Sequence, residues 1–169
     1  MKEGERIVVG VDPGLNITGY GVLAANGGAP RLVEAGVIRG GRGAIERRLQ
    51  ELHVGLSELL ATYRPAVVAI EELYSHYDRP RTAILMGHAR GVICLAAAQA
   101  SSPVFHYAAT HVKKMLTGSG RAPKNQMQAA VCREFGLREP PHPADVADAV
   151  AIALCHHYSQ STTWKALQG

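Results

Sequence analysis

Apolar and polar positions alternate along the first 40 residues in a way that predicts three short strands. Residues 7–11 form a β-branched run, and a Pro-Gly turn separates this run from a second one at residues 18–25. Residues 31–39 predict a third strand after the turn-forming residues 26–30. We therefore expect the chain to begin as an antiparallel meander.

A helical period replaces the strand pattern at Ala44, where leucines begin to recur every three or four positions between charged residues. This helix should end near Tyr63, because Pro65 disfavours a helical conformation at the residue before it. Residues 66–70 then form another continuous apolar run, typical of a strand buried on both faces. A strand, a crossover helix and a second strand together predict parallel pairing.

The second half of the chain is predicted to be mainly helical, with one further strand. The expected strand is 104–107, and the expected helices are about 82–100, 111–116, 126–135 and 144–157. The small residues of the helix at 82–100 would allow close packing against the sheet or against a second copy of the chain. The predicted fold class is α/β, with a five-stranded mixed sheet, and the length of 169 residues fits a single domain, 1–169.

Two of the predicted buried strands end at an acidic residue. Asp12 follows the first strand, and Glu71 follows the strand at 66–70, so parallel pairing should place both at one edge of the sheet. Glu72 competes with Glu71, because adjacent strand residues face opposite ways; we favour Glu71 as the first residue after the apolar run. Asp12 could instead simply cap a tight turn before Pro13.

Asp145 and Asp148 are three residues apart and therefore share one face of the last predicted helix. The rest of that helix is apolar or small, and a buried carboxylate is costly unless it is neutralised. The alternative is that both acids complement the helix dipole near the N-terminus. Near the C-terminal end of this helix, His156 and His157 are expected to interact favourably with the helix dipole rather than to bind a metal.

Charge and cysteine content narrow the classes of function. Lys and Arg number 18 against 14 Asp and Glu, and the isoelectric point is near 9.1, which favours a polyanionic partner. Three cysteines without Cys-x-x-Cys spacing indicate reduced thiols and a cytoplasmic location. With no signal-like segment and no apolar run of about 18 residues, we expect neither export nor a membrane partner.

Four converging carboxylates would repel one another unless cations or protons neutralised them. Ligand sets made only of oxygen select hard ions, so Mg²⁺ or Mn²⁺ is expected rather than zinc. Two such ions about 4 Å apart can promote hydrolysis of a phosphodiester. A basic chain with an acidic cluster thus predicts a metal-dependent nuclease whose cleavage depends on metal more than its DNA binding does.

Several motifs together resemble the RuvC-type Holliday junction resolvases, in the same order and over nearly the whole chain. These motifs are residues 7–14, 18–21, 69–72, 118–124 and 144–149. The resemblance implies an RNase H-like fold, a homodimer, two Mg²⁺ ions per active site, and paired symmetric nicks in a four-way junction during recombination and repair. It also implies a partner complex of the RuvA/RuvB type that drives branch migration.

The resemblance also assigns residues to roles. The metal-binding and catalytic acids would be Asp12, Glu71, Asp145 and Asp148. Lys113 and Lys124 would lie near the phosphate, with Lys124 also catalytic, and Tyr74 would act at the junction centre. Some family members carry His where this chain has Asp145. Further basic residues in loops or at helix ends are expected to contact DNA phosphates: Arg79, Arg81, Lys114 and Arg121.

Two other classes of function remain as alternatives. The pattern of Asp12, Gly14, Thr18 and Gly19 also resembles the first phosphate loop of actin-like ATPases and sugar kinases, but such enzymes need a second lobe that 169 residues cannot supply. A non-catalytic junction-binding protein is the other alternative. Intact acids at all four positions weigh against it, because a pure binder would gain from losing negative charge that faces DNA.

Overall fold

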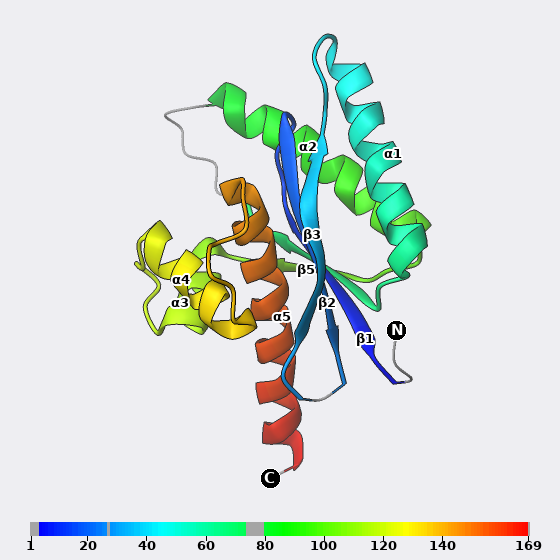
Figure 1. The fold of residues 1–169 in the computed structure, drawn as a ribbon. Helices are drawn as coiled ribbons and strands as arrows, with labels where there is room; N and C mark the ends of the chain where they lie inside the picture. The colour runs from blue at the N-terminus through cyan, green and yellow to red at the C-terminus, as the bar shows by residue number, and fades with distance from the viewer. Residues whose placement is uncertain (1–3, 27, 74–79, 169) are drawn as a thin grey trace.

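The protein folds as one central sheet with helices on both faces, as the computed structural model shows for residues 4–26, 28–73 and 80–168 and for side chains up to residue 160 (Figure 1). The strands are β1 (Arg6–Asp12), β2 (Ile17–Ala25), β3 (Arg31–Arg39), β4 (Val67–Glu71) and β5 (Val104–Tyr107). The helices are α1 (Ile45–Tyr63), α2 (Pro80–Gln99), α3 (Ala109–Thr117), α4 (Lys124–Phe135) and α5 (Ala144–Gln168).

The strand order is β3-β2-β1-β4-β5. β1 pairs with β2, and β2 with β3, in antiparallel fashion, which confirms the predicted meander. β4 lies parallel to β1 and to β5, which confirms the predicted mixed sheet. Val11 pairs with Ile70 in the β1–β4 register, so Asp12 and Glu71 follow at the same edge.

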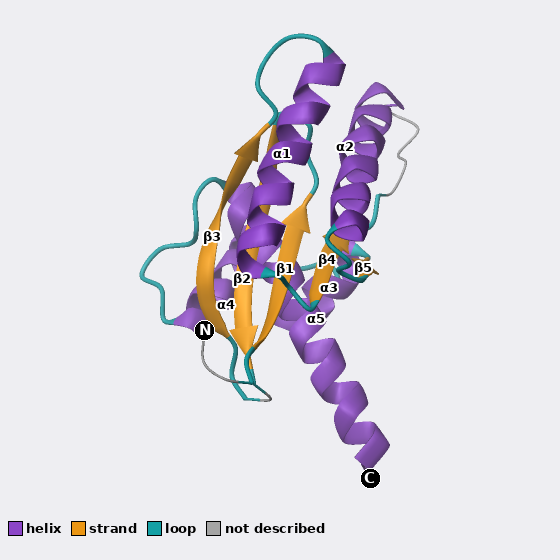
Figure 2. Cartoon of the chain, turned by 90° about the vertical axis from the view of Figure 1, so that its right-hand side faces the viewer, coloured by secondary structure: helices purple, strands orange, loops and turns teal. Residues whose placement is uncertain are grey.

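Alternate residues of the central strands reach two separate apolar cores. Ile7, Val9 and Val11 pack into the layer formed by α1 and α2, whereas Val8 and Ala69 pack into the layer of α3, α4 and α5. Figures 1 and 2 show these two helical layers on opposite faces of the sheet. Burial on both faces explains why β1 and β4 are continuous apolar runs rather than alternating ones.

Helix α5 lies unusually close to the sheet because glycines of β1 and β2 lie beneath it. A Cβ atom placed on Gly19 would lie 2.0 Å from the carbonyl oxygen of Asp145, and one on Gly10 would lie 2.2 Å from that of Ala149. Atoms cannot approach so closely, so any larger residue would push α5 away. The glycines therefore set the height of the first turns of α5, which carry two of the predicted acids.

Four helices differ from their predicted bounds. α2, α3 and α4 each begin two residues earlier than expected, and α5 continues to Gln168 instead of ending at residue 157. The end of α5 projects past the sheet (Figure 2), and the sequence there loses the apolar pattern that predicted the helix. Within the described ranges, no helix is both long enough and apolar enough to cross a membrane.

Candidate active site

Four acids from distant parts of the chain come together where β1 and β4 end. Asp12 is the last residue of β1, Glu71 is the last residue of β4, and the first two turns of α5 carry Asp145 and Asp148. Burial raises the pKa of Asp12 to about 8, helped by the negative charges of Glu71, Asp148 and Asp145 and opposed by Lys124. The Asp12 carboxyl group is therefore close enough to the other three acids for their charges to raise its pKa, as expected if the four acids converge.

Glu71 senses both the acids and two lysines. Burial raises its pKa and Asp148 raises it further, while Lys113 and Lys124 lower it. Glu71, Asp148 and the two lysines line a cavity of about 230 Å³, whose apolar wall includes Met127. The cavity therefore places positive and negative groups within reach of one small ligand.

Lys124 forms an ion pair with Asp148, with 2.9 Å between Nζ and Oδ2. This hydrogen bond raises the pKa of Lys124, so its ammonium group stays charged. Lys124 is also the first residue of α4, where the helix dipole disfavours a cation. The nearby carboxylates offset that disadvantage and hold the lysine over the acids.

The chemistry of the donor set fits a hard cation. The four acids offer only carboxylate oxygens, and the pKa of Asp12 is raised first by burial and then by the negative charges of the other three acids, which Lys124 only partly opposes. As the side chains stand, no three His, Cys, Asp or Glu side chains in the described ranges are arranged to hold one ion. An ion bound among these acids would therefore require their side chains to reorient.

The structure separates Glu71 from Glu72. Glu71 lines the cavity, whereas the backbone N–H of Glu72 donates to the carbonyl of Tyr107 at 2.8 Å. Burial and Arg90 lower the pKa of His106, and the charge of Glu72 opposes that lowering, so Glu72 lies toward His106. Glu71 and Glu72 therefore have different neighbours, which favours Glu71 as the member of the acidic cluster.

The other predicted DNA contacts are spread around this edge. Lys113 in α3 is half-buried and lines the cavity, while Arg81, Lys114 and Arg121 are exposed in α2, in α3 and in the loop before α4. Tyr74 and Arg79 lie outside the described residues.

A turn that the sequence analysis did not assign to the site follows Asp12. The Thr18 hydroxyl donates to the Gly14 carbonyl at 2.6 Å and accepts from the Gly14 N–H at 3.3 Å. Thr18 is fully buried, so these two hydrogen bonds stabilise the β1–β2 turn from its buried side. The signal in the sequence was a hydroxyl residue four positions after Gly14, which alone does not distinguish a residue that closes a turn from an ordinary strand residue.

The predicted dipole role of His156 is wrong. α5 continues for twelve residues after it, so His156 lies inside the helix, where it is buried and its Nδ1 lies 2.8 Å from the Tyr107 hydroxyl. Burial, together with the charges of Arg6 and His157, lowers its pKa to about 4. A neutral, buried imidazole cannot complement a helix dipole.

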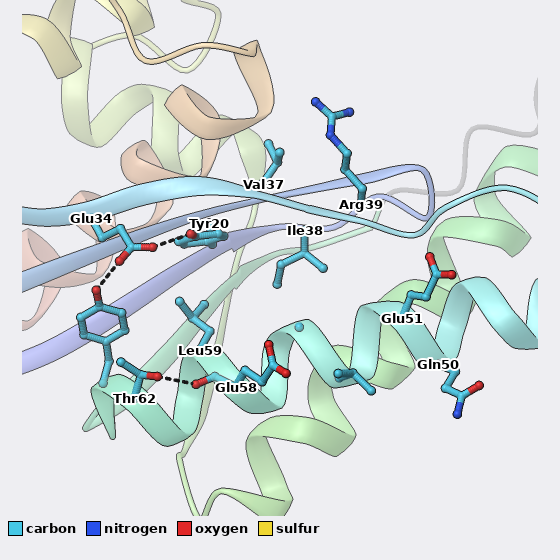
Figure 3. Close-up of a pocket in the computed structure, with 13 residues that line it drawn as sticks. Tyr20, Glu34, Val37, Ile38, Arg39, Gln50, Glu51, Glu58, Leu59 and Thr62 are labelled. Atoms are coloured by element: carbon cyan, nitrogen blue, oxygen red, sulfur yellow. Dashed lines mark hydrogen bonds between the residues drawn. The ribbon is translucent and has the colours of Figure 1, made fainter.

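A second concave surface lies between β3 and α1 and contains none of the predicted site residues. This groove of about 640 Å³ holds Glu34, which accepts a hydrogen bond from the Tyr20 hydroxyl at 2.5 Å and another from Tyr63 (Figure 3). Glu51 and Glu58 also line it. It lies beside α1, on the sheet face opposite α5 (Figure 1), so it is separate from the acidic cluster.

Comparisons with known proteins agree with this geometry. Residues 8–156 match the family model described as "Crossover junction endodeoxyribonuclease RuvC". A protein of that description from Rhodopirellula baltica is 59% identical over 152 residues, which cover 89% of this chain and 85% of the relative. The structure of Thermus thermophilus RuvC is 34% identical with a TM-score of 0.85, covering 93% of this chain and 96% of that one. The same TM-score and identity are found for T. thermophilus RuvC in complex with Holliday junction substrate, over 94% and 96% of the two chains.

Proposed function

Because the chain belongs to the RuvC family of crossover junction endodeoxyribonucleases, with an RNase H-like fold, we propose that it is a structure-selective endonuclease that resolves four-way DNA junctions. The observation that carries this proposal is the convergence of four acids, two lysines and a cavity at one edge of the sheet. The junction in the T. thermophilus complex supports the same substrate class. The products would be paired, symmetric nicks in opposing strands, made during recombination and repair.

The acids Asp12, Glu71, Asp145 and Asp148 would hold divalent ions, two Mg²⁺ per active site, with Mn²⁺ as a substitute. When bound about 4 Å apart, such ions would activate water and stabilise the leaving oxygen of a phosphodiester. The burial of Asp12 and Glu71 supports this assignment, because their carboxylates would be unfavourable without cations.

Lys113 and Lys124 would orient the phosphate over the acids. Both line the cavity with Glu71, and Lys124 carries its charge on an exposed, flexible side chain that already reaches Asp148. When DNA enters, the Lys124 ammonium can move from the carboxylate to a phosphate oxygen without leaving the cavity. Tyr74, Arg79, Arg81, Lys114 and Arg121 would extend the contacts to the junction centre and to the backbone of its arms.

Two copies of the chain would be needed for two symmetric nicks, so we infer a homodimer. Exposed apolar side chains on α2, Ile84 at 62% and Leu95 at 52%, support a second copy packing there. A sedimentation mass of twice 18.0 kDa is expected, and a persistent monomer at high concentration would contradict this inference. From family membership we also infer a single domain, a cytoplasmic location and a motor partner of the RuvA/RuvB type.

The proposal is tested by mapping the cuts in a four-way junction and in linear duplexes of the same sequences. We expect Mg²⁺-dependent nicks at symmetric positions in two opposing strands of the junction and little cutting of the duplexes. Equal cutting of both substrates would remove the structure selectivity. Binding to the junction without any cutting in Mg²⁺ or Mn²⁺ would instead indicate a non-catalytic junction-binding protein.

A further inference from the structure

A groove of about 640 Å³ runs along the outer face of α4 and the segment that follows it. Asn125, Gln128, Cys132 and Arg133 line it from the helix, at the spacing that places residues on one helical face, and Arg138 lines it from the following segment. The opposite face of α4 is anchored in the core through Met127 and Val131. The groove is therefore a fixed surface, with a helix as one wall.

The groove is positively charged and its charge is not neutralised by the protein. Arg133 and Arg138 are both exposed, and within the described ranges neither side chain forms an ion pair or a hydrogen bond with another residue. The rest of the lining includes two side-chain amides and no acid. Paired donors of this kind suit a ligand with repeated anionic oxygens, such as a phosphate backbone.

The position of the groove relates it to the acidic cluster. Lys124 begins α4 beside Asp148, and Arg133 is nine residues further along the same helix. At 1.5 Å per residue this is about 13 Å. Nine residues are also about two and a half turns, so Arg133 lies on the side of α4 opposite Lys124, and a phosphate backbone that contacts both follows the side of the helix between them.

We propose that the outer face of α4, through Arg133 and Arg138, binds the phosphate backbone of a duplex arm of the junction. The inference rests on the proposed function, because it takes the Lys124 end of α4 as the place where DNA is cut. It adds a second anchoring point that fixes the direction in which an arm leaves the active site. Asn125 and Gln128 lie between the two points and would donate hydrogen bonds to the same strand.

The first test measures junction binding against KCl concentration without divalent ions. The affinity falls as salt rises, and each lost phosphate contact should make the slope of log affinity against log salt less steep by about 0.9. The double variant Arg133→Gln/Arg138→Gln should therefore reduce the steepness by about 1.8. The matched control, Arg47→Gln/Arg64→Gln, removes two exposed arginines of α1 and its C-cap on the other sheet face and should leave the slope unchanged. An equal slope in the wild type and the α4 variant would overturn the proposal.

The second test uses the wild-type protein, so it does not depend on how a variant folds. Cys132 is half-buried in the groove, whereas Cys155 is buried and Cys94 lies in α2. Saturating four-way junction should slow alkylation of Cys132 at least about fivefold, as followed by peptide mass spectrometry. Unchanged alkylation of Cys132 in the complex would contradict DNA binding in the groove, whereas wild-type cleavage of the junction would still support the proposed function.

Discussion

At the scale of single residues, the site depends on carboxylates that are placed where they are unfavourable. Asp12 is half-buried and surrounded by three other acids, which is why its pKa rises to about 8. Such a group lowers the stability of the ion-free protein and becomes useful only when positive charge arrives. The Lys124–Asp148 pair offsets part of this cost in the structure.

Asp12→Asn should therefore stabilise the protein in the presence of a chelator. The amide keeps the shape of the side chain but removes a charge from the cluster, and we expect a gain on the order of 1–2 kcal/mol in the free energy of unfolding near pH 8. Urea denaturation measures the gain. Glu139→Gln, at an exposed position, is the control and should change little; a loss of stability in Asp12→Asn would show that its carboxylate is well satisfied without ions.

The two adjacent glutamates should respond differently to the same substitution. Glu71→Gln should lower single-turnover nicking of a bound junction at least about a hundredfold, because it removes the negative charge and one carboxylate oxygen of a proposed metal ligand. Glu72→Gln should change the rate by less than about threefold, since Glu72 does not line the cavity and is not among the charges that raise the pKa of Asp12. The opposite order of effects would move the active-site role to Glu72.

His156 should make the protein sensitive to acid. Its folded pKa of about 4 is below the unfolded value of 6.5, so the unfolded state binds the proton first and stability falls as pH drops through this window. Between about pH 7.5 and pH 5, the expected loss from this group is at most about 2 kcal/mol. Urea denaturation of His156→Gln should show a smaller acid loss than the wild type; equal losses would assign the sensitivity to other groups.

At the scale of elements, helix α5 and the strands beneath it form the part of the fold that positions the site. α5 brings Asp145 and Asp148 to the edge where β1 and β4 end, and its height is set by backbone contact with Gly10 and Gly19. Small changes at this contact should therefore move two acids together relative to Asp12.

Gly19→Ala should be strongly destabilising, because its Cβ would lie 2.0 Å from the Asp145 carbonyl oxygen. We expect a loss of about 1–3 kcal/mol in the free energy of unfolding, and slower nicking even at temperatures where the variant is folded. Gly28→Ala is the matched control: its added Cβ would meet only Asn26 Oδ1, at 3.9 Å, which is an ordinary contact, so stability should change little. Similar effects of both substitutions would argue against close packing as the cause.

The elements show how far the sequence alone can lead. The strands and their pairing were predictable because buried apolar runs and a crossover helix leave few topologies, and the β3 bounds agree to the residue. The full length of α5 was not predictable, because the last part of its sequence lacks the apolar pattern that predicted the rest of the helix. The Lys124–Asp148 pair was also beyond prediction, since it depends on where α4 begins relative to α5.

At the scale of the whole molecule, charge is divided between a basic exterior and an acidic interior cluster. The net charge of +4 attracts a polyanion, while the clustered acids repel it locally until cations are bound. Binding and cutting should therefore separate, with binding governed by the lysines and arginines and cutting by the acids. The convergence of the acids was predictable from the strand ends and the helix spacing.

The most direct test of this account is the single-turnover nicking rate of a preformed four-way junction complex, measured across Mg²⁺ concentrations for the wild type and Asp12→Asn. We predict that the wild-type rate rises with Mg²⁺ and saturates, while the variant binds the junction as tightly and cuts it at least about a hundredfold more slowly. Cutting by Asp12→Asn at the wild-type rate, or cutting by the wild type in a chelator, would contradict the central claim that these acids act by holding divalent ions.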